Sequence, residues 1–240
     1  MGVGANWVMN KIVYRGYRFP PEIIQRAVWL YYRFTLSFRD VEELLAERGI
    51  EVTYETIRQW VIHFGPAIAR DLRSRRPRPH GQWHLDEMFV SIGGKWMYLW
   101  RAVDAEGEVL DCLVQTRRNR RAARKLMRKL MKKQGFVPTT IVTDNLACYA
   151  AAIIDLRRSV VHDRGKRTNN CAESSHVPIR RRERKMQGFK SPGSAQRFLS
   201  IHGSIYNTFN TCRHLISAAN HRRFRAEAFA SWREAVGVAA

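Results

Sequence analysis

The region that begins at Trp83 constrains the fold of this chain most, because the spacing of its apolar residues changes there to that of strands. Residues 83–92 are predicted to form a strand, and Gly93-Gly94 suits a two-residue hairpin turn into a second strand at 95–103. A third strand is predicted at 108–114. The pattern therefore predicts a three-stranded antiparallel meander.

The elements after the meander complete the prediction of an α/β domain. Asn119 is expected to cap a helix that ends at Gly135. A buried strand at 139–143, a helix at 147–156 and an edge strand at 159–161 follow. The order β-β-β-α-β-α-β-α is that of an RNase H-like fold, in which helices flank a mixed five-stranded sheet.

Two short helices upstream of the strands have the pattern of a helix-turn-helix. Ser37 and Asp40 match a capping box that opens the first helix, Gly49 suits its left-handed end, and Thr53 is placed to cap the second helix. The second helix of such a motif can enter the major groove of DNA. Its exposed first turns carry our candidates for DNA contacts, which are Thr56, Arg58 and Gln59. Two amphipathic helices packed in an ordinary bundle are the alternative.

These patterns predict two domains. Residues 1–76 are assigned to an all-α helix-turn-helix DNA-binding region, with a linker at about 70–81 that contains two prolines and several arginines. Residues 82–240 are assigned to the RNase H-like catalytic domain, which would include C-terminal helices at 191–210 and 225–236.

The charge of the chain indicates a polyanionic partner. The chain contains 42 Lys and Arg residues against 21 Asp and Glu residues, a formal net charge of +21. The helix predicted after Asn119 concentrates this excess, and no acidic residue lies between Asp111 and Asp144 to offset it. Its polar face includes Arg120 and Arg124, which we interpret as contacts to double-stranded DNA. A solvated basic surface without a partner is the alternative.

Other features argue against a membrane or secreted protein. No apolar run approaches the roughly 20 residues of a spanning helix, and the first residues lack the basic and apolar segments of a signal peptide. The four cysteines are widely separated and form no Cys-x-x-Cys pair, so neither a zinc site nor a disulfide framework is indicated. We therefore expect a cytoplasmic protein with no membrane partner.

Three carboxylates point to metal-dependent chemistry on DNA phosphodiesters. Asp86 lies in the middle of the first predicted strand, Asp144 ends the fourth, and Glu173 begins a strongly basic segment. If the first and fourth strands are neighbours about 4.8 Å apart, Asp86 and Asp144 can share a pair of divalent ions. Oxygen ligands suit Mg²⁺ or Mn²⁺. A lone Asp on a strand is more often a capping or edge residue, so the prediction depends on all three positions together.

The motifs around these carboxylates resemble those of the bacterial transposases of insertion-sequence family 6, which belong to the Asp-Asp-Glu transposase and retroviral-integrase superfamily. The resemblance extends from the helix-turn-helix to about Ser191. The motifs that carry it are His84-Leu-Asp-Glu-x-Phe-Val90, Thr143-Asp-x-x-x-x-Tyr149, Asn169-Asn-x-x-Glu173 and Gly188-Phe-Lys-Ser191.

The resemblance implies a DNA transposase that binds the terminal inverted repeats of an insertion sequence, cleaves to expose 3′-hydroxyls and joins them to target DNA by two-metal phosphoryl transfer. Asp86, Asp144 and Glu173 would then be the catalytic residues and the ligands of two Mg²⁺ or Mn²⁺ ions. Arg180 and its basic neighbour Arg181 would contact the DNA of the element ends. Because two ends must be handled together, a homodimer or a larger synaptic assembly in the bacterial cytoplasm is expected.

One feature departs from the family pattern, and a second bears on the helix that follows Glu173. The interval between Asp144 and Glu173 is shorter than is usual in the family. Weaker rivals for the third ligand are therefore Asp155, Asp163 and Glu183. Pro178 also interrupts the helical path that would carry Glu173 and Arg180 on one face.

Two other functions fit parts of the sequence. A catalytically inactive regulator that only binds the same DNA ends would use the helix-turn-helix and the positive charge, but it would leave the carboxylates unexplained. A related metal-dependent nuclease would hydrolyse DNA without joining it, and analysis of the reaction products would separate it from a transposase.

Overall fold

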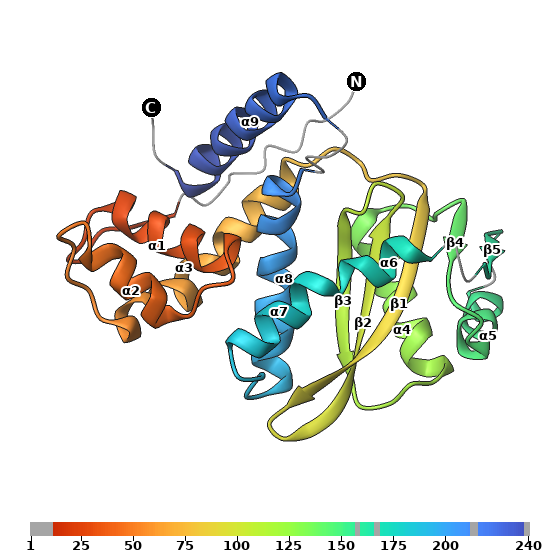
Figure 1. The fold of residues 1–240 in the computed structure, drawn as a ribbon. Helices are drawn as coiled ribbons and strands as arrows, with labels where there is room; N and C mark the ends of the chain where they lie inside the picture. The colour runs from red at the N-terminus through yellow and green to blue at the C-terminus, as the bar shows by residue number, and fades with distance from the viewer. Residues whose placement is uncertain (1–11, 157–158, 166–168, 212–215, 238–240) are drawn as a thin grey trace. The chain divides into compact units, whose positions relative to one another are not determined.

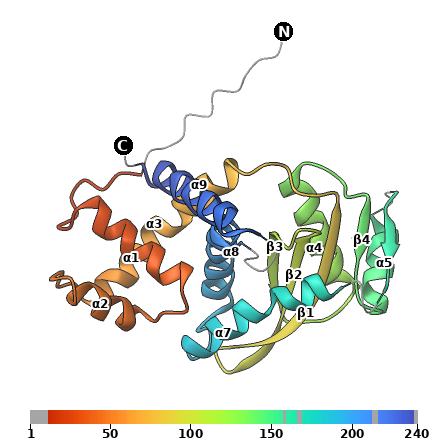
Figure 2. The ribbon, with the colours of Figure 1, turned by 45° about the horizontal axis from the view of Figure 1, so that its top comes forward.

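A computed structural model shows two compact units, each built around its own core (Figure 1, Figure 2). The first unit comprises Met1–Arg76 together with Thr208–Ala240, and the second comprises Pro77–Asn207. The residues that the structure describes are 12–156, 159–165, 169–211 and 216–237.

The first unit is helical and contains both helices of the predicted helix-turn-helix, the second of them longer than expected. Its helices are α1 (Pro21–Arg33), α2 (Phe38–Ala46), α3 (Tyr54–Ser74) and α9 (Ala218–Val236). The capping box of α2 is present, because Ser37 Oγ accepts a hydrogen bond from the Asp40 amide at 3.1 Å and Asp40 Oδ2 accepts one from the Ser37 amide at 2.8 Å. Gly49 has a left-handed φ of 72°, and the Thr53 hydroxyl caps α3. These caps confirm where α2 and α3 begin.

α3 is longer than predicted, which moves the start of the linker. The sequence was interpreted as a short helix with a linker from about residue 70, whereas α3 continues to Ser74. Apolar side chains recur at helical spacing along the added turns, and Phe64, Ile68 and Leu72 are buried. Burial of this stripe outweighs the hydrogen bond that Pro66 removes from the middle of the helix.

α9 packs with the N-terminal helices, although the sequence placed it in the catalytic domain at 82–240. The ring of Phe229 lies 5.4 Å from that of Trp29 in α1 and 5.2 Å from that of Phe209. α9 also begins at Ala218, earlier than predicted. The boundary differs from the prediction because it depends on aromatic contacts between residues far apart in sequence, which a local pattern does not contain.

The described residues of the second unit form a mixed five-stranded sheet, which confirms the predicted RNase H-like fold class. The strands are β1 (Gln82–Ile92), β2 (Lys95–Asp104), β3 (Val109–Gln115), β4 (Thr140–Val142) and β5 (Val161–Asp163). Their order is β3-β2-β1-β4-β5. The first three strands form the antiparallel meander, and β4 and β5 run parallel to β1. β5 begins two residues later than predicted.

Helices cover both faces of this sheet. They are α4 (Arg120–Gln134), α5 (Ala147–Asp155), α6 (Asn170–Ser175), α7 (Val177–Lys185) and α8 (Pro192–Phe209). α4 and α5 pack on one face around Trp83, Leu85 and Trp100. α6 crosses the other face, where Ala172 packs against Val103 (Figure 1). Among the described helices of both units, none combines the length and the apolar character that spanning a membrane requires.

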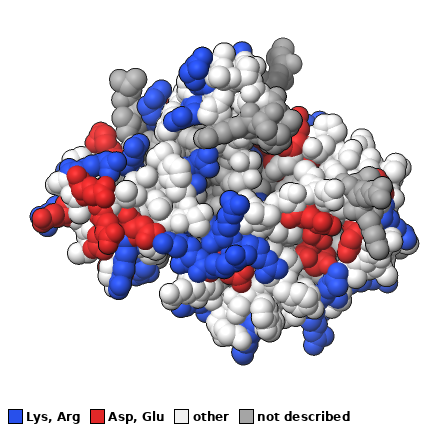
Figure 3. All heavy atoms as spheres, in the orientation of Figure 1, with Lys and Arg blue, Asp and Glu red and all other residues white. Residues whose placement is uncertain are grey.

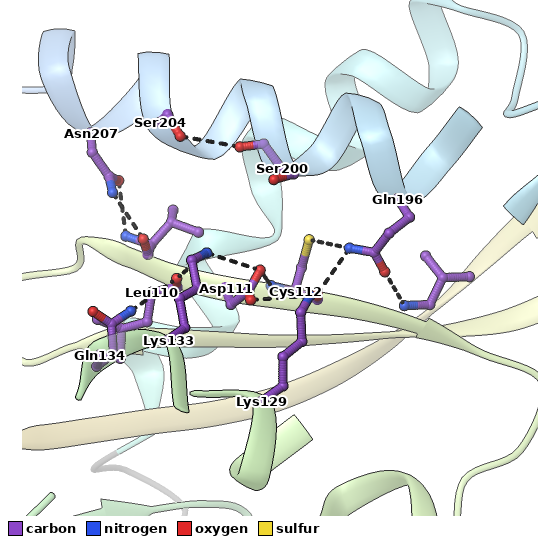
Figure 4. A network of polar contacts seen from close by, with 12 residues as sticks. Leu110, Asp111, Cys112, Lys129, Lys133, Gln134, Gln196, Ser200, Ser204 and Asn207 are labelled. Atoms are coloured by element: carbon purple, nitrogen blue, oxygen red, sulfur yellow. Dashed lines mark hydrogen bonds and ion pairs between the residues drawn. The ribbon is translucent and has the colours of Figure 1, made fainter. Parts of the chain in front are cut away.

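The outer edge of β3 is closed by amide side chains of α8 (Figure 4). The Asn207 side chain accepts a hydrogen bond from the Val109 amide and donates one to the Val109 carbonyl, both at 2.9 Å. Gln196 accepts from the Val114 amide at 3.1 Å and donates to the Cys112 carbonyl at 3.0 Å. These side chains occupy the backbone groups with which an edge strand would otherwise recruit another strand.

Removal of these two amides is expected to open the edge of β3. In the variant Gln196→Ala/Asn207→Ala, the backbone amides of Val109 and Val114 lose their acceptors, so their hydrogen–deuterium exchange should accelerate by about fivefold or more. Mass spectrometry or NMR of the exchanging amides measures this. Ser204→Ala is the control, because the Ser204 hydroxyl bonds to the backbone of α8 itself. Equal exchange rates in the double variant and the wild type would contradict the prediction.

Candidate active site

The register of β1 and β4 brings two of the predicted carboxylates together. His84 of β1 pairs with Val142 of β4, and Asp86 and Asp144 each lie two residues further along. Because adjacent strands are about 4.8 Å apart, both side chains reach the same region. Carboxylate oxygens of Asp86, Glu87 and Asp144 all lie within 4.8 Å of one another, and this carboxylate cluster is the centre of the site.

Glu87 is a member of this cluster that the sequence pattern did not reveal. It follows Asp86 directly, and on a flat strand it would point to the opposite face. Its side chain is only 2% exposed. The Tyr149 hydroxyl of α5 donates to Glu87 Oε2 at 2.6 Å, and Arg118 Nε donates to Glu87 Oε1 at 2.6 Å. Tyr149 stood in one of the sequence motifs, but no local rule connects it with Glu87.

Hydrogen bonds and one cation offset part of the negative charge of the cluster. Arg118 Nη2 lies 3.6 Å from Asp144 Oδ2. Burial raises the pKa of Glu87, and the hydrogen bond from Tyr149 and the charge of Arg118 oppose this rise. Burial also raises the pKa of the Tyr149 hydroxyl well above its ordinary value, so this group remains a hydrogen-bond donor at neutral pH.

Two buried hydrogen bonds fix α6 and its N-cap residue over β1 and β2. Asn169 Nδ2 donates to the Leu85 carbonyl at 3.1 Å, and Arg101 Nε donates to Ser175 Oγ at 2.9 Å. His176, which follows α6, places Nε2 3.0 Å from Asp86 Oδ2. The chain after α6 therefore reaches the carboxylate cluster.

Glu173 lies on α6, three residues before His176, and its side chain is exposed. In the described part of the chain, the cluster of carboxylates within 4.8 Å contains Glu87 and not Glu173. The docking of α6 puts Glu173 on the same face of the sheet as Asp86. Its role as the third ligand stays a prediction.

The sequence predicted one helix that carries Glu173 and Arg180 on the same face. In the structure this helix is interrupted between the two residues. α6 ends before His176, and α7 starts with Pro178 in its first turn, where the missing amide hydrogen costs least. Arg180 Nη1 lies 3.7 Å from Glu183 Oε2, and 41% of the Arg180 side chain is exposed. Basic side chains gather over α7 in Figure 3. Contact of Arg180 and Arg181 with DNA stays a prediction.

The candidate DNA contacts at the start of α3 are already bonded to neighbouring side chains, Arg58 and Gln59 to Glu55 and Thr56 to Thr53. Glu55 accepts hydrogen bonds from Arg58 Nε and Nη2 at 2.8 and 2.7 Å, and from Gln59 Nε2 at 3.0 Å. The Thr56 hydroxyl lies 3.0 Å from that of Thr53. The hydrogen bonds from Arg58 and Gln59 lower the pKa of Glu55 to about 2. A contact of Arg58 or Gln59 with DNA would therefore have to share or displace this carboxylate.

Arg120 and Arg124 of α4, the other candidate DNA contacts, both reach Asp155 of α5. Arg120 Nε donates to Asp155 Oδ2 at 2.6 Å, and Arg124 Nη1 lies 3.7 Å from the same oxygen. Asp155 is thus engaged by arginines and lies outside the carboxylate cluster. The other rivals for the third ligand, Asp163 and Glu183, accept hydrogen bonds from backbone amides.

The sequence indicated that no acidic residue offsets the positive charge of α4. The structure corrects this, because Asp111 lies next to two of the lysines of α4. Asp111 of β3, whose side chain is 2% exposed, lies 3.0 Å from Lys129 Nζ and 3.3 Å from Lys133 Nζ (Figure 4). The sequence interval without acidic residues did not show this compensation, because Asp111 reaches α4 from a neighbouring strand.

The donor set of the carboxylate cluster fits a hard divalent cation. Asp86, Glu87 and Asp144 offer only oxygen atoms, which Mg²⁺ and Mn²⁺ prefer. The side chains of Asp86 and Asp144 are 15% and 35% exposed, so an ion and its water ligands would have access from their side of the cluster. The geometry therefore supports a metal-assisted reaction at this junction of β1 and β4.

Comparison with known protein families and sequences gives concordant results. The family described as "DDE domain" matches residues 80–211. The transposase for insertion sequence-like element IS431mec of Staphylococcus aureus (strain Mu50) is 31% identical over 188 residues, which are 76% of this chain and 83% of that protein. The transposase for insertion sequence element IS257 in transposon Tn4003 of Staphylococcus aureus is 30% identical over the same shares of the two chains.

Comparison with solved structures gives weaker similarities. The catalytic core domain of BIV integrase has a TM-score of 0.41 and 14% identity, over 63% of this chain and 98% of that chain. The simian T-cell lymphotropic virus intasome in complex with PP2A regulatory subunit B56 gamma has a TM-score of 0.46 and 16% identity, over 58% of this chain and 53% of that chain.

Proposed function

The chain belongs to the transposases of insertion-sequence family 6, and from this premise we propose that it binds the terminal inverted repeats of an insertion sequence, cleaves the DNA to expose 3′-hydroxyls and joins these to target DNA. Membership in the family makes the protein a DNA transposase.

The single observation that carries this proposal is the meeting of Asp86 and Asp144 at the junction of two parallel strands. These two residues, together with Glu173, would hold two Mg²⁺ or Mn²⁺ ions. When bound, such ions polarise the phosphate and activate the attacking hydroxyl. His176 holds the Asp86 carboxylate in place at 3.0 Å, and the docking of α6 brings Glu173 to the same face of the sheet.

The positive charge of the chain supplies the attraction to the DNA backbone. Its net charge of +21 favours any double-stranded DNA through the release of counterions. On the catalytic unit, we propose backbone contacts by Arg180 and Arg181 of α7 and by Arg120 and Arg124 of α4. On the helical unit, the start of α3 with Thr56, Arg58 and Gln59 would read the inverted repeats.

Two element ends must be cut and joined in a coordinated way, so we propose that the active form is a homodimer or a larger assembly on DNA. Each protomer would contribute one carboxylate cluster to one end. Light scattering of the purified protein with and without end DNA measures the assembly, and one protomer bound per pair of ends would contradict it.

A strand-transfer assay tests the proposed function. Full-length protein is mixed with a duplex that carries the element's own end, a supercoiled plasmid and Mg²⁺ or Mn²⁺. Joined product that requires the divalent ion supports the proposal. Hydrolysed ends without joined product would assign a nuclease instead, and binding without any strand cleavage would assign a regulator of the same ends.

A further inference from the structure

Arg118 lies between β3 and α4 and reaches the carboxylate cluster with one edge of its guanidinium. Both Nε and Nη2 lie 2.6 Å from Glu87 Oε1, and Nη2 lies 3.6 Å from Asp144 Oδ2. The Arg118 side chain is 38% exposed, whereas that of Glu87 is 2% exposed. The guanidinium is therefore anchored on its inner side and open to solvent on its outer side.

The anchor of Arg118 is rigid. The Tyr149 hydroxyl holds the second oxygen of Glu87 at 2.6 Å, and Tyr149 itself is fully buried. Asn119, the next residue after Arg118, caps α4 by accepting a hydrogen bond from the Ala122 amide at 3.0 Å. Backbone and side chain of Arg118 are thus both fixed before any ligand binds, and this preorganisation is what electrostatic stabilisation of a reaction requires.

The solvent-facing edge of the Arg118 guanidinium carries N–H groups that can donate to a ligand. A guanidinium carries five N–H donors in a planar fork, and Nη1 makes no hydrogen bond to any residue in the described ranges. A phosphate matches such a fork, because two of its oxygens can accept from two parallel N–H groups. A lysine would offer a single point charge instead.

We propose that Arg118 contacts the phosphate at which the DNA strand is cut and joined, and that Glu87 and Tyr149 position it there. The inference rests on the proposed function of the carboxylate cluster. In the reaction, the attacking hydroxyl oxygen bonds to phosphorus while the bond to the leaving oxygen breaks. Water takes up the proton of the attacking hydroxyl and supplies one to the leaving oxygen. Arg118 keeps its protons throughout and stabilises the charge on the phosphate oxygens.

A structural role alone would also place an arginine beside carboxylates, so the test must separate the two roles. The test uses full-length protein and a pair of end duplexes that differ at one position. One carries the natural phosphate at the cleavage position, and the other carries an uncharged methylphosphonate there. A residue that acts through that phosphate loses its effect when the phosphate charge is removed, and a merely structural residue does not.

On the natural duplex, Arg118→Ala is expected to lower the single-turnover rate of cleavage by about 10²–10³-fold, as removal of one preorganised donor does elsewhere. On the methylphosphonate duplex, the wild type and Arg118→Ala should react at rates within about threefold of each other. Arg118→Lys should recover part of the loss. Arg117→Ala is the matched control: Arg117 is exposed and adjacent, so both of its rates should equal those of the wild type.

Equilibrium binding gives a second measurement that does not depend on turnover. With Ca²⁺ in place of the catalytic ion, the wild type should bind the natural duplex about tenfold or more tightly than the neutral one. Arg118→Ala should reduce this preference to the part that the bound Ca²⁺ contributes, whereas Arg117→Ala should keep it in full. Equal loss of rate on both duplexes, or an unchanged binding preference in Arg118→Ala, would overturn the inference.

The positioning residues have a test of their own. Glu87→Gln and Tyr149→Phe should each reduce both the rate and the phosphate preference, by less than Arg118→Ala does, because the guanidinium remains but is less well held. A variant that loses rate but keeps the full phosphate preference would assign Glu87 or Tyr149 to another role. If the wild type neither cuts nor joins DNA, the proposed function fails, and the binding preference still reports on Arg118 separately.

Discussion

Asp86→Asn and Asp144→Asn are each expected to abolish strand transfer while leaving the binding of end DNA intact. Each change replaces a negatively charged carboxylate of the cluster by a neutral carboxamide, which binds a divalent ion more weakly. Loss of several kcal/mol of metal-derived stabilisation corresponds to a rate reduction of about a thousandfold or more. Electrophoretic mobility shift and the strand-transfer assay, run on the same protein preparations, measure binding and joining separately.

Two further variants sharpen this prediction. Asp155→Asn is the matched control, because the Asp155 carboxylate binds Arg120 and lies outside the cluster, so joining should stay within about threefold of the wild type. Glu173→Gln should abolish joining as Asp86→Asn does. Full activity of Glu173→Gln would remove Glu173 from the site and leave Glu87 as the third carboxylate, whereas full activity of Asp86→Asn would refute the assignment of the whole cluster.

Trp100→Ala is expected to destabilise the catalytic unit by about 3–5 kcal/mol, the range for removal of a fully buried tryptophan side chain. Trp100 lies in β2 with no exposed surface and packs edge-on against Tyr149, with 5.5 Å between the ring centroids. The cavity would thus form beneath the residue that holds Glu87. Urea denaturation followed by circular dichroism measures the change in the free energy of unfolding.

Trp96→Ala is the matched control for this loss of stability. Trp96 lies on the same strand and is 71% exposed. Its removal should change the free energy of unfolding by no more than about 0.5 kcal/mol. Similar losses in the two variants would show that the buried core around Trp100 is not what stabilises the sheet.

Most elements of the catalytic unit were predictable from the sequence, because their determinants are close together along the chain. Apolar runs bounded by glycine-containing turns marked β1, β2 and β3, and Gly93-Gly94 marked the hairpin between the first two. Asn119 and Gly135 marked the ends of α4. The meeting of Asp86 and Asp144 followed from one further assumption, that the first and fourth strands are neighbours, and their parallel register bears it out.

The hydrogen bonds between side chains in the first turns of α3 could also have been predicted from the sequence, although they were not. Glu55 precedes Arg58 by three residues and Gln59 by four, which is the spacing at which side chains meet on a helix. The prediction considered these side chains only as contacts to DNA. Their mutual hydrogen bonds could have been expected from spacing alone.

Most of the secondary structure depends on interactions over a few residues, so the amino-acid sequence specifies it directly. The meeting of Asp86 with Asp144 needs in addition the parallel pairing of β1 with β4, which the sequence allowed and the tertiary structure decided. Other contacts depend on packing between residues far apart in sequence. Glu87 and Tyr149 anchor Arg118 in this way, and Asp111 in this way offsets the positive charge of α4. The association of α9 with the N-terminal helices has the same origin. No local pattern encodes such contacts, because they exist only after the helices and the sheet have packed and water has been excluded between them.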